Sequence, residues 1–351
     1  MNSVRSALEN KGIDSEYRRN RRKSICFLVI LSGVLLAAIF LSLRAGAYKM
    51  PMAELIKGIF GLSSDPRINL VIRNNRLPRI CTAILAGGGL GLAGCILQAV
   101  LHNPLASAST LGVSQGATFG AAFAIVVLGM GSTAGMGITL CAFFGSIAVA
   151  LVILGLSKFR QISPEGIVLS GVAISSMFTG ATTLIQYFAD EVQLSTLVFW
   201  TFGDLGSTGW EDLGGMGLVV GILCIYCFLH RWDYNALLSG EETAISLGIR
   251  VKRLTLVNML LCCLCSSVVV SHVGLISFIG LVAPHIVRMV VGNNHVYLIP
   301  GSILGGAALL LLGDLFARMV ISPVILPIGA ITSFLGGPLF LYLLFKGGKR
   351  E

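Results

Sequence analysis

The sequence predicts an all-α integral membrane protein with about ten transmembrane helices. Of its 351 residues, 55% are hydrophobic and only 12% are charged, against roughly a quarter charged in soluble domains. The apolar residues fall in long runs such as 25–43, 138–156 and 254–270, and a helix needs about 20 such residues to cross a bilayer. A β-barrel strand would alternate apolar and polar residues, which these runs do not do.

Ten runs are predicted to be spans, and the first is not a cleaved signal sequence. The run 25–43 is longer than a signal-peptide core, and Arg44 follows it in place of a small-residue cleavage site. We expect a cytoplasmic tail at 1–24, a transmembrane domain at 25–347 and a cytoplasmic C-terminus at 348–351. The predicted spans are 25–43, 79–101, 112–130, 135–156, 165–189, 213–230, 254–271, 274–291, 297–317 and 325–346.

The charge distribution predicts the orientation of these spans. Five of the six residues 18–23 are basic and directly precede the first span, which predicts a cytoplasmic N-terminus. Ten spans then return the C-terminus to the cytoplasm. The loop 190–212 falls outside and carries five acidic residues but no Lys or Arg. The net charge of +9 is spread over loops between spans, so it does not indicate nucleic-acid binding.

One outer loop breaks this pattern. The segment 44–79 carries seven Lys and Arg residues on the predicted outer face. Such a cluster either steers and aligns an acidic partner or belongs to an ordinary solvated loop, and the residues alone leave both readings open.

The sequence gives no support for an ATP-binding, metal-binding or dinucleotide-binding site. No GxxxxGK[ST] phosphate loop occurs, so any ATP that drives the protein must bind another subunit. The five histidines show no metal-ligand spacing. Gly89, Gly91 and Gly94 have GxGxxG spacing, but they lie in an apolar span where Gly87 and Gly91 form a GxxxG helix-packing motif. We therefore predict no catalytic, cofactor-binding or metal site in this chain.

Acidic residues are scarce inside the spans, which argues against a proton relay. Asp314 is the main exception, and it lies four residues before Arg318. This is the helical spacing at which opposite charges pair. We predict an ion pair near the outer end of the ninth span.

The inner loop 233–252 contains a predicted short helix. Glu241 and Glu242 stand at its start, where the helix dipole favours acids, and Gly248 stands at its end. Glu242, Ala244 and Gly248 match three positions of the EAAxxxG pattern in cytoplasmic loops of ABC importer permeases. The alternative is an ordinary capped loop helix. Pro104 and Pro284 mark breaks near inner span ends, which are candidate gates or plain helix ends.

Together these residues resemble the FecCD family of ABC importer permeases, which serve iron-siderophore, haem and cobalamin uptake. The resemblance covers residues 25–347, and it implies a type II ABC importer permease bundle. Its specific pieces are Arg76–Arg79, Gln98, Asn103–Ala106, Leu111–Val113, Gly116–Ala117, Gly240–Glu242, Ala244, Leu247, Gly248, Ile276–Val282, Pro284–Arg288, Gly313–Asp314, Ala317–Arg318 and Leu326–Gly329.

The resemblance also implies partners and residue roles. It implies a dimer with a second permease copy or paralogue, two cytoplasmic ATPase subunits that bind ATP and Mg²⁺, and an extracytoplasmic solute-binding protein. The location implied is the cytoplasmic membrane of a prokaryote. Outward arginines would pair with glutamates of the binding protein, and inner residues would couple to the ATPase or form the cytoplasmic gate. The matching residues are Arg76, Arg79 and Arg318 for docking, Glu241, Glu242, Ala244, Leu247 and Gly248 for coupling, and Asn103 and Leu105 for the gate.

Two other functions stay open at this point. An ion-coupled secondary transporter would take up cargo without any ATPase partner. A membrane receptor would bind cargo without moving it across the bilayer.

Overall fold

The computed structural model describes residues 2–46, 50–131, 134–160, 163–322 and 324–347. Within these ranges every regular element is a helix, and no strand occurs. The all-α prediction is confirmed.

Seven helices in the described residues are long and apolar enough to cross a membrane, and three shorter apolar helices accompany them. The seven long and three shorter helices agree in number with the ten predicted spans. The long helices are α1 (Asn2–Arg44), α4 (Leu77–Val100), α6 (Gly135–Arg160), α7 (Pro164–Tyr187), α9 (Trp210–Leu229), α12 (Val251–Val273) and α14 (His295–Met319); the shorter are α5 (Val113–Ala122) with η2 (Phe123–Val127), α13 (Ile279–Val291) and α15 (Ile328–Gly347).

Helix α4 forms the centre of the bundle and packs against α9, α12, α13 and α14. Its glycines let neighbouring backbones approach closely. A Cβ at Gly94 would lie 1.7 Å from the Gly280 carbonyl oxygen, and one at Gly91 would lie 2.4 Å from that of Ser302. Only glycine fits at such crossings. The helix-packing interpretation of this motif is confirmed.

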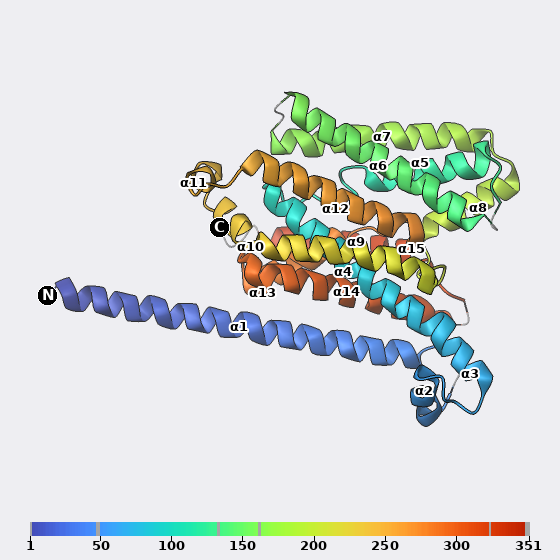
Figure 1. Cartoon of the computed structure of the whole chain (residues 1–351), viewed down its shortest axis with the longest axis horizontal. Coiled ribbons are helices and arrows are strands. Elements are labelled where there is room, and N and C mark those ends of the chain that lie inside the picture. Colours follow the sequence, from blue (N-terminus) through green and yellow to red (C-terminus); the bar gives the residue numbers. More distant parts are fainter. Residues whose placement is uncertain (1, 47–49, 132–133, 161–162, 323, 348–351) are drawn as a thin grey trace.

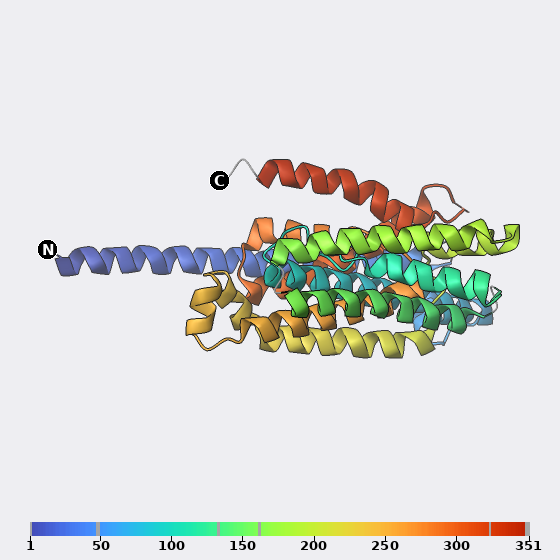
Figure 2. The ribbon, with the colours of Figure 1, turned by 90° about the horizontal axis from the view of Figure 1, so that it is seen from above.

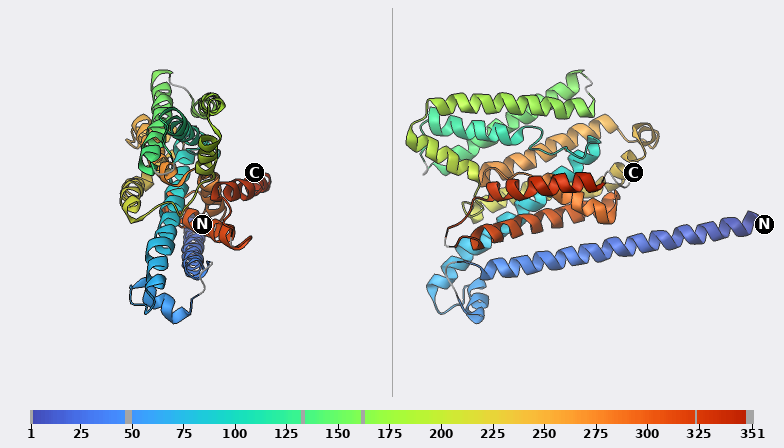
Figure 3. Two further views of the ribbon diagram at one scale, coloured as in Figure 1. Left: turned by 90° about the vertical axis from the view of Figure 1, so that its right-hand side faces the viewer. Right: turned by 180° about the vertical axis from the view of Figure 1, so that it is seen from behind.

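The bundle has two dissimilar ends (Figure 1). One end, called here the α11 end, carries α10 (Arg231–Leu237), α11 (Glu241–Ser246) and the first residues of α1. The opposite end, called the α2 end, carries α2 (Met52–Ile59), α3 (Pro66–Val71), η1 (Ile72–Arg76) and α8 (Glu191–Phe202). Figure 2 shows α15 along one flank, and Figure 3 shows α2 and α3 at the edge opposite α6 and α7.

Three features differ from the sequence expectations. The segment 1–24, expected as a polar tail, continues the first span from Asn2 as the single helix α1. The outer loops contain the helices α2, α3 and α8. The predicted span 274–291 begins with an irregular stretch, because Gly274 and Phe278 have φ angles of 81° and 65° and the helix starts only at Ile279. Hydropathy does not reveal such a break, since the apolar run is continuous.

A second irregular stretch, 101–112, joins α4 to α5. Its Leu101, Ala106 and Leu111 are fully buried. Non-helical backbone is tolerated at membrane depth only inside protein or beside a water-filled cavity. Both shorter helices, α5 and α13, therefore start from irregular segments that are partly buried in the bundle.

Candidate functional site

Two arginines share one buried carboxylate at the α2 end. Asp314 of α14 is fully buried. Its Oδ2 lies 2.9 Å from Nε of Arg318 on the same helix, which confirms the predicted pair, and its Oδ1 lies 2.8 Å from Nε of Arg79 on α4. The sequence does not predict the second contact, because Arg79 and Asp314 are 235 positions apart in the chain and no local spacing links them.

The same cluster holds the C-terminal end of α1. Arg318 donates through Nη2 to the Ser42 hydroxyl and through Nη1 to the Ala45 carbonyl, and Arg76 donates to the Leu43 carbonyl. Carbonyls at a helix C-terminus have no partner within the helix, and guanidinium groups satisfy them well. The cluster thus ties α1, α4 and α14 together.

The three predicted docking arginines are neighbours, but they do not face outward as expected. Arg76 and Arg79 are only 5% and 7% exposed, and the Arg318 side chain is only 9% exposed. Their docking role stays a prediction. Among the described residues of the α2 end, the exposed basic ones are Arg44, Lys57, Arg67 and Arg73.

At the opposite end, α11 has the form that the sequence predicts. Gly240 and Gly248, with φ angles of 103° and 85°, flank the helix, and both acids lie in its first turn. Ala244 is fully buried, whereas Glu241, Glu242, Leu247 and Gly248 are exposed. Leu247 is 67% exposed and lies beside Ile245, which is also exposed. An apolar pair next to two acids suits contact with another protein.

The loop that carries α11 is anchored firmly. The buried Tyr234 hydroxyl of α10 donates to Oδ1 of Asn258 on α12 at 2.7 Å. A hollow of about 550 Å³ lies beside α11 and is lined in part by Asp233, Arg250 and Arg253. Helix α10, which precedes α11, is therefore linked to the transmembrane helix α12 by a buried hydrogen bond.

The predicted gate residues lie in the irregular stretch 101–112. Asn103 Oδ1 accepts a hydrogen bond from the Leu105 amide at 2.8 Å, and Leu105 is 41% exposed. The neighbouring His102 has a φ angle of 45°, and its Nε2 lies 3.5 Å from the Leu237 carbonyl oxygen of α10. The stretch thus sits next to the loop that carries α11. No observation tests its role as a gate.

Sequence reasoning missed a hydroxyl face on α7. Ser175, Ser176, Thr179 and Thr183 line an open hollow of about 510 Å³ together with Thr110. Each of the four α7 hydroxyls donates to the backbone carbonyl four residues earlier. The spacing 175, 179, 183 places these residues on one helix face and would have revealed the face from sequence.

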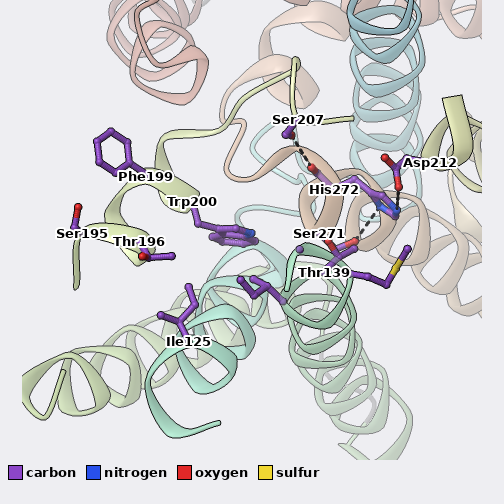
Figure 4. Close-up of a pocket in the computed structure, with 13 residues that line it drawn as sticks. Ile125, Thr139, Ser195, Thr196, Phe199, Trp200, Ser207, Asp212, Ser271 and His272 are labelled. Carbon is purple, nitrogen blue, oxygen red and sulfur yellow. Dashed lines mark hydrogen bonds and ion pairs between the residues drawn. The ribbon is translucent and has the colours of Figure 1, made fainter. Parts of the chain in front are cut away.

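A second hollow of about 460 Å³ opens at the α2 end between α6, α8, α9 and α12. Figure 4 shows Trp200 between the α8 side chain of Phe199 and the pair formed by His272 and Asp212. His272 Nδ1 lies 2.8 Å from the Val268 carbonyl oxygen, so Nε2 faces Asp212 Oδ1 at 3.9 Å. Among the described residues no group of three or more His, Cys, Asp or Glu could hold a metal ion.

Residues 34–346 match the FecCD transport family. The chain belongs to this family. A Methanocaldococcus jannaschii protein, named as an ABC transporter permease, is 47% identical over 347 residues, which cover 96% of this chain and 99% of that protein. BtuC of Escherichia coli K12, the permease of a vitamin B12 import system, is 35% identical, with coverage of 95% and 98%.

Solved structures agree with this family assignment. An inward-facing conformation of a metal-chelate type ABC transporter is similar with a TM-score of 0.79 and 30% identity, over 91% of this chain and 98% of that chain. PsaBC from Streptococcus pneumoniae shares the fold with a TM-score of 0.55 and 19% identity, over 83% of this chain and 95% of that chain.

The FecCD chain is thus a multi-pass membrane protein and the non-catalytic permease subunit of an ABC importer of the FecCD and BtuC type. A permease of this type works with ATPase subunits and a binding protein.

Proposed function

We propose that this permease moves an iron-siderophore, haem or cobalamin-like complex into the cytoplasm of a prokaryote. It receives cargo from a solute-binding protein at the α2 end, and two ATPase subunits seated at the α11 end drive the movement. One observation carries the proposal: a cluster of three arginines and an exposed acidic-capped helix lie at opposite ends of one apolar bundle.

The orientation rests on charge. The basic residues Arg18 to Lys23 are exposed and precede the apolar part of α1 at the α11 end. Such clusters stay in the cytoplasm. We therefore place both termini and α11 in the cytoplasm and the α2 end outside.

The hydroxyl face of α7 supports a pathway beside this helix. A polar stripe exposed on a transmembrane helix favours water or another protein over lipid. We place a second permease copy or a paralogue opposite it, so that the two chains enclose the route. The hydroxyls already donate within α7, so they offer passing cargo only weak contacts, and a bulky chelate is not retained.

The cargo class rests on similarity to named proteins. BtuC belongs to a vitamin B12 import system, and the similar inward-facing structure is of metal-chelate type. No charged residue lines the α7 hollow, which fits a cargo whose identity is selected by the binding protein. We propose no cofactor for this chain; ATP and Mg²⁺ bind the partner ATPases.

Uptake into proteoliposomes tests this function. The permease is reconstituted with its ATPase and binding protein, and radiolabelled ferric siderophore, haem and cobalamin are offered in parallel. We expect one of them to accumulate only when ATP, ATPase and binding protein are all present. Uptake that persists without the ATPase and stops when ion gradients are dissipated would indicate a secondary transporter. Binding without accumulation would indicate a receptor.

A further inference from the structure

Arg79 contacts two carboxylates of very different exposure. Its Nε is paired with the fully buried Asp314, while its Nη2 lies 3.3 Å from Oδ1 of Asp204. The Asp204 side chain is 57% exposed. One half of the guanidinium is therefore fixed in the bundle, and the other half meets a carboxylate at the surface of the outer end.

Asp204 begins the loop that follows α8. Its Oδ1 also accepts a hydrogen bond from the Gly206 amide at 2.8 Å, and its own amide donates to the Val273 carbonyl at 2.8 Å. A Cβ at Gly206 would lie 2.6 Å from Nη1 of Arg79. The guanidinium therefore lies directly against this loop, and Arg79 connects it to the core of the bundle.

We propose that Asp204 is an intramolecular competitor for Arg79. Its carboxylate occupies the position that an acidic side chain of the extracytoplasmic partner takes on docking, and docking releases the loop after α8. The inference rests on the proposed function, because it names how the binding protein reaches an arginine that is buried in the undocked chain.

The exchange is favoured by the geometry. Asp314 holds Arg79 in its orientation throughout, so the partner replaces only the contact with Asp204. The Asp204 carboxylate is exposed to solvent, which weakens its pairing with Arg79, so this contact is more easily replaced than the buried one. An incoming carboxylate also meets repulsion from Asp204, which is relieved only when the loop moves away.

Release of the loop changes the outer hollow. Ser207 of this loop and Trp200 of α8 both line it. The end of α8 is held by close backbone contact, since a Cβ at Gly274 would lie 2.5 Å from the Trp200 carbonyl oxygen. When Asp204 moves, the loop that carries Ser207 and the end of α8 therefore move with it, and both line the hollow.

The test uses the full-length permease in nanodiscs with Asp204→Asn. The amide oxygen of asparagine still accepts from Gly206, so the variant keeps the turn and removes only the charge. Asp204→Ser is a second variant of the same kind, and Glu211→Gln, an exposed acid at the same end, is the matched control. Arg79 reactivity with phenylglyoxal is measured by mass spectrometry, with the exposed Arg67 as internal reference.

We expect both Asp204 variants to raise Arg79 labelling by about two- to fivefold, the range for loss of an exposed ion pair. Glu211→Gln leaves it unchanged. Unchanged labelling in folded Asp204 variants overturns the proposal, and this readout needs no partner.

The second readout is affinity for the solute-binding protein that supports uptake in the proteoliposome assay. Asp204→Asn is expected to tighten binding by about two- to fivefold at low salt, and less at high salt. Raised labelling with unchanged or weaker binding overturns the competitor role. Failure of every binding protein to support uptake counts against the proposed function, while the labelling result still decides whether Asp204 shields Arg79.

Discussion

The two ends of the bundle differ in whether the residues predicted to contact partners are buried or exposed. At the α2 end the arginines Arg76 and Arg79 are buried and engaged within the chain. At the α11 end Glu242 and Leu247 are exposed on a short helix that follows α10, which is linked to α12 by a buried hydrogen bond. In the proposed function, the binding protein therefore replaces an existing contact at the α2 end, which suits a partner that binds and dissociates. The proposed ATPase contact at the α11 end needs no such replacement, which suits a partner that stays bound.

The largest effect is expected at the buried carboxylate. Asp314→Ala leaves Arg79 and Arg318 without their shared partner, and an uncompensated buried charge costs about 3–5 kcal/mol. Thermal unfolding of the purified permease should shift strongly downward, whereas Glu191→Ala, an exposed acid of α8, should change little. Replacing all three network residues together by apolar side chains should recover most of the loss. An unchanged unfolding temperature in Asp314→Ala would contradict the network.

The next largest effect is expected on ATPase binding at the α11 end, with little change in the stability of the permease. Leu247→Asp removes an exposed apolar contact, so it should leave stability within about 0.5 kcal/mol yet weaken ATPase assembly by about tenfold or more. Co-purification of the ATPase with the permease measures this. Leu238→Asp, an exposed apolar residue just before α11, is the control and should retain assembly. Equal loss in both variants would show a general surface effect.

A smaller effect is expected from the shape of the coupling loop. Gly248→Ala forces an alanine into a φ angle of 85°, which costs about 1–2 kcal/mol. The end of α11 should then shift, so that ATP hydrolysis continues while transport per ATP falls. Gly221→Ala, a glycine of α9 with open space at its Cβ position, should not change this ratio. Full coupling in Gly248→Ala would mean that the loop tolerates other shapes.

The smallest effect concerns the exposed basic residues of the α2 end. Arg67→Glu and Arg73→Glu should slow association of the binding protein by about two- to tenfold at low salt, because they reduce electrostatic attraction. The difference should disappear at high salt, where exposed charges are screened. Stopped-flow association at two salt concentrations checks this. A loss that persists at high salt would indicate direct contact in place of steering.

Much of the fold follows from hydropathy. The ten apolar segments, the packing role of Gly91 and the short helix with its terminal Gly248 were all predicted, because each depends on local composition or spacing. The Asp314 and Arg318 pair was predicted for the same reason, since four residues make one helical turn.

The features that the sequence did not predict depend on contacts between segments that are far apart in the chain. The pairing of Arg79 with Asp314 and with Asp204 exists only because three helix ends meet. Burial of the arginines follows from that meeting and could not be read from their spacing. The break before Ile279 was hidden in a continuous apolar run, because backbone angles at Gly274 and Phe278 leave no trace in hydropathy.

The length of α1 constrains what can be assembled around the permease. Its 43 residues give a rod of about 65 Å at 1.5 Å per residue, roughly twice the thickness of the bilayer's hydrocarbon core. The N-terminal part of α1 therefore extends beyond the α11 end of the bundle (Figure 1). A subunit that binds at the α11 end, as proposed, must leave room for this segment, so the length of α1 limits the size of the partner that fits beside it.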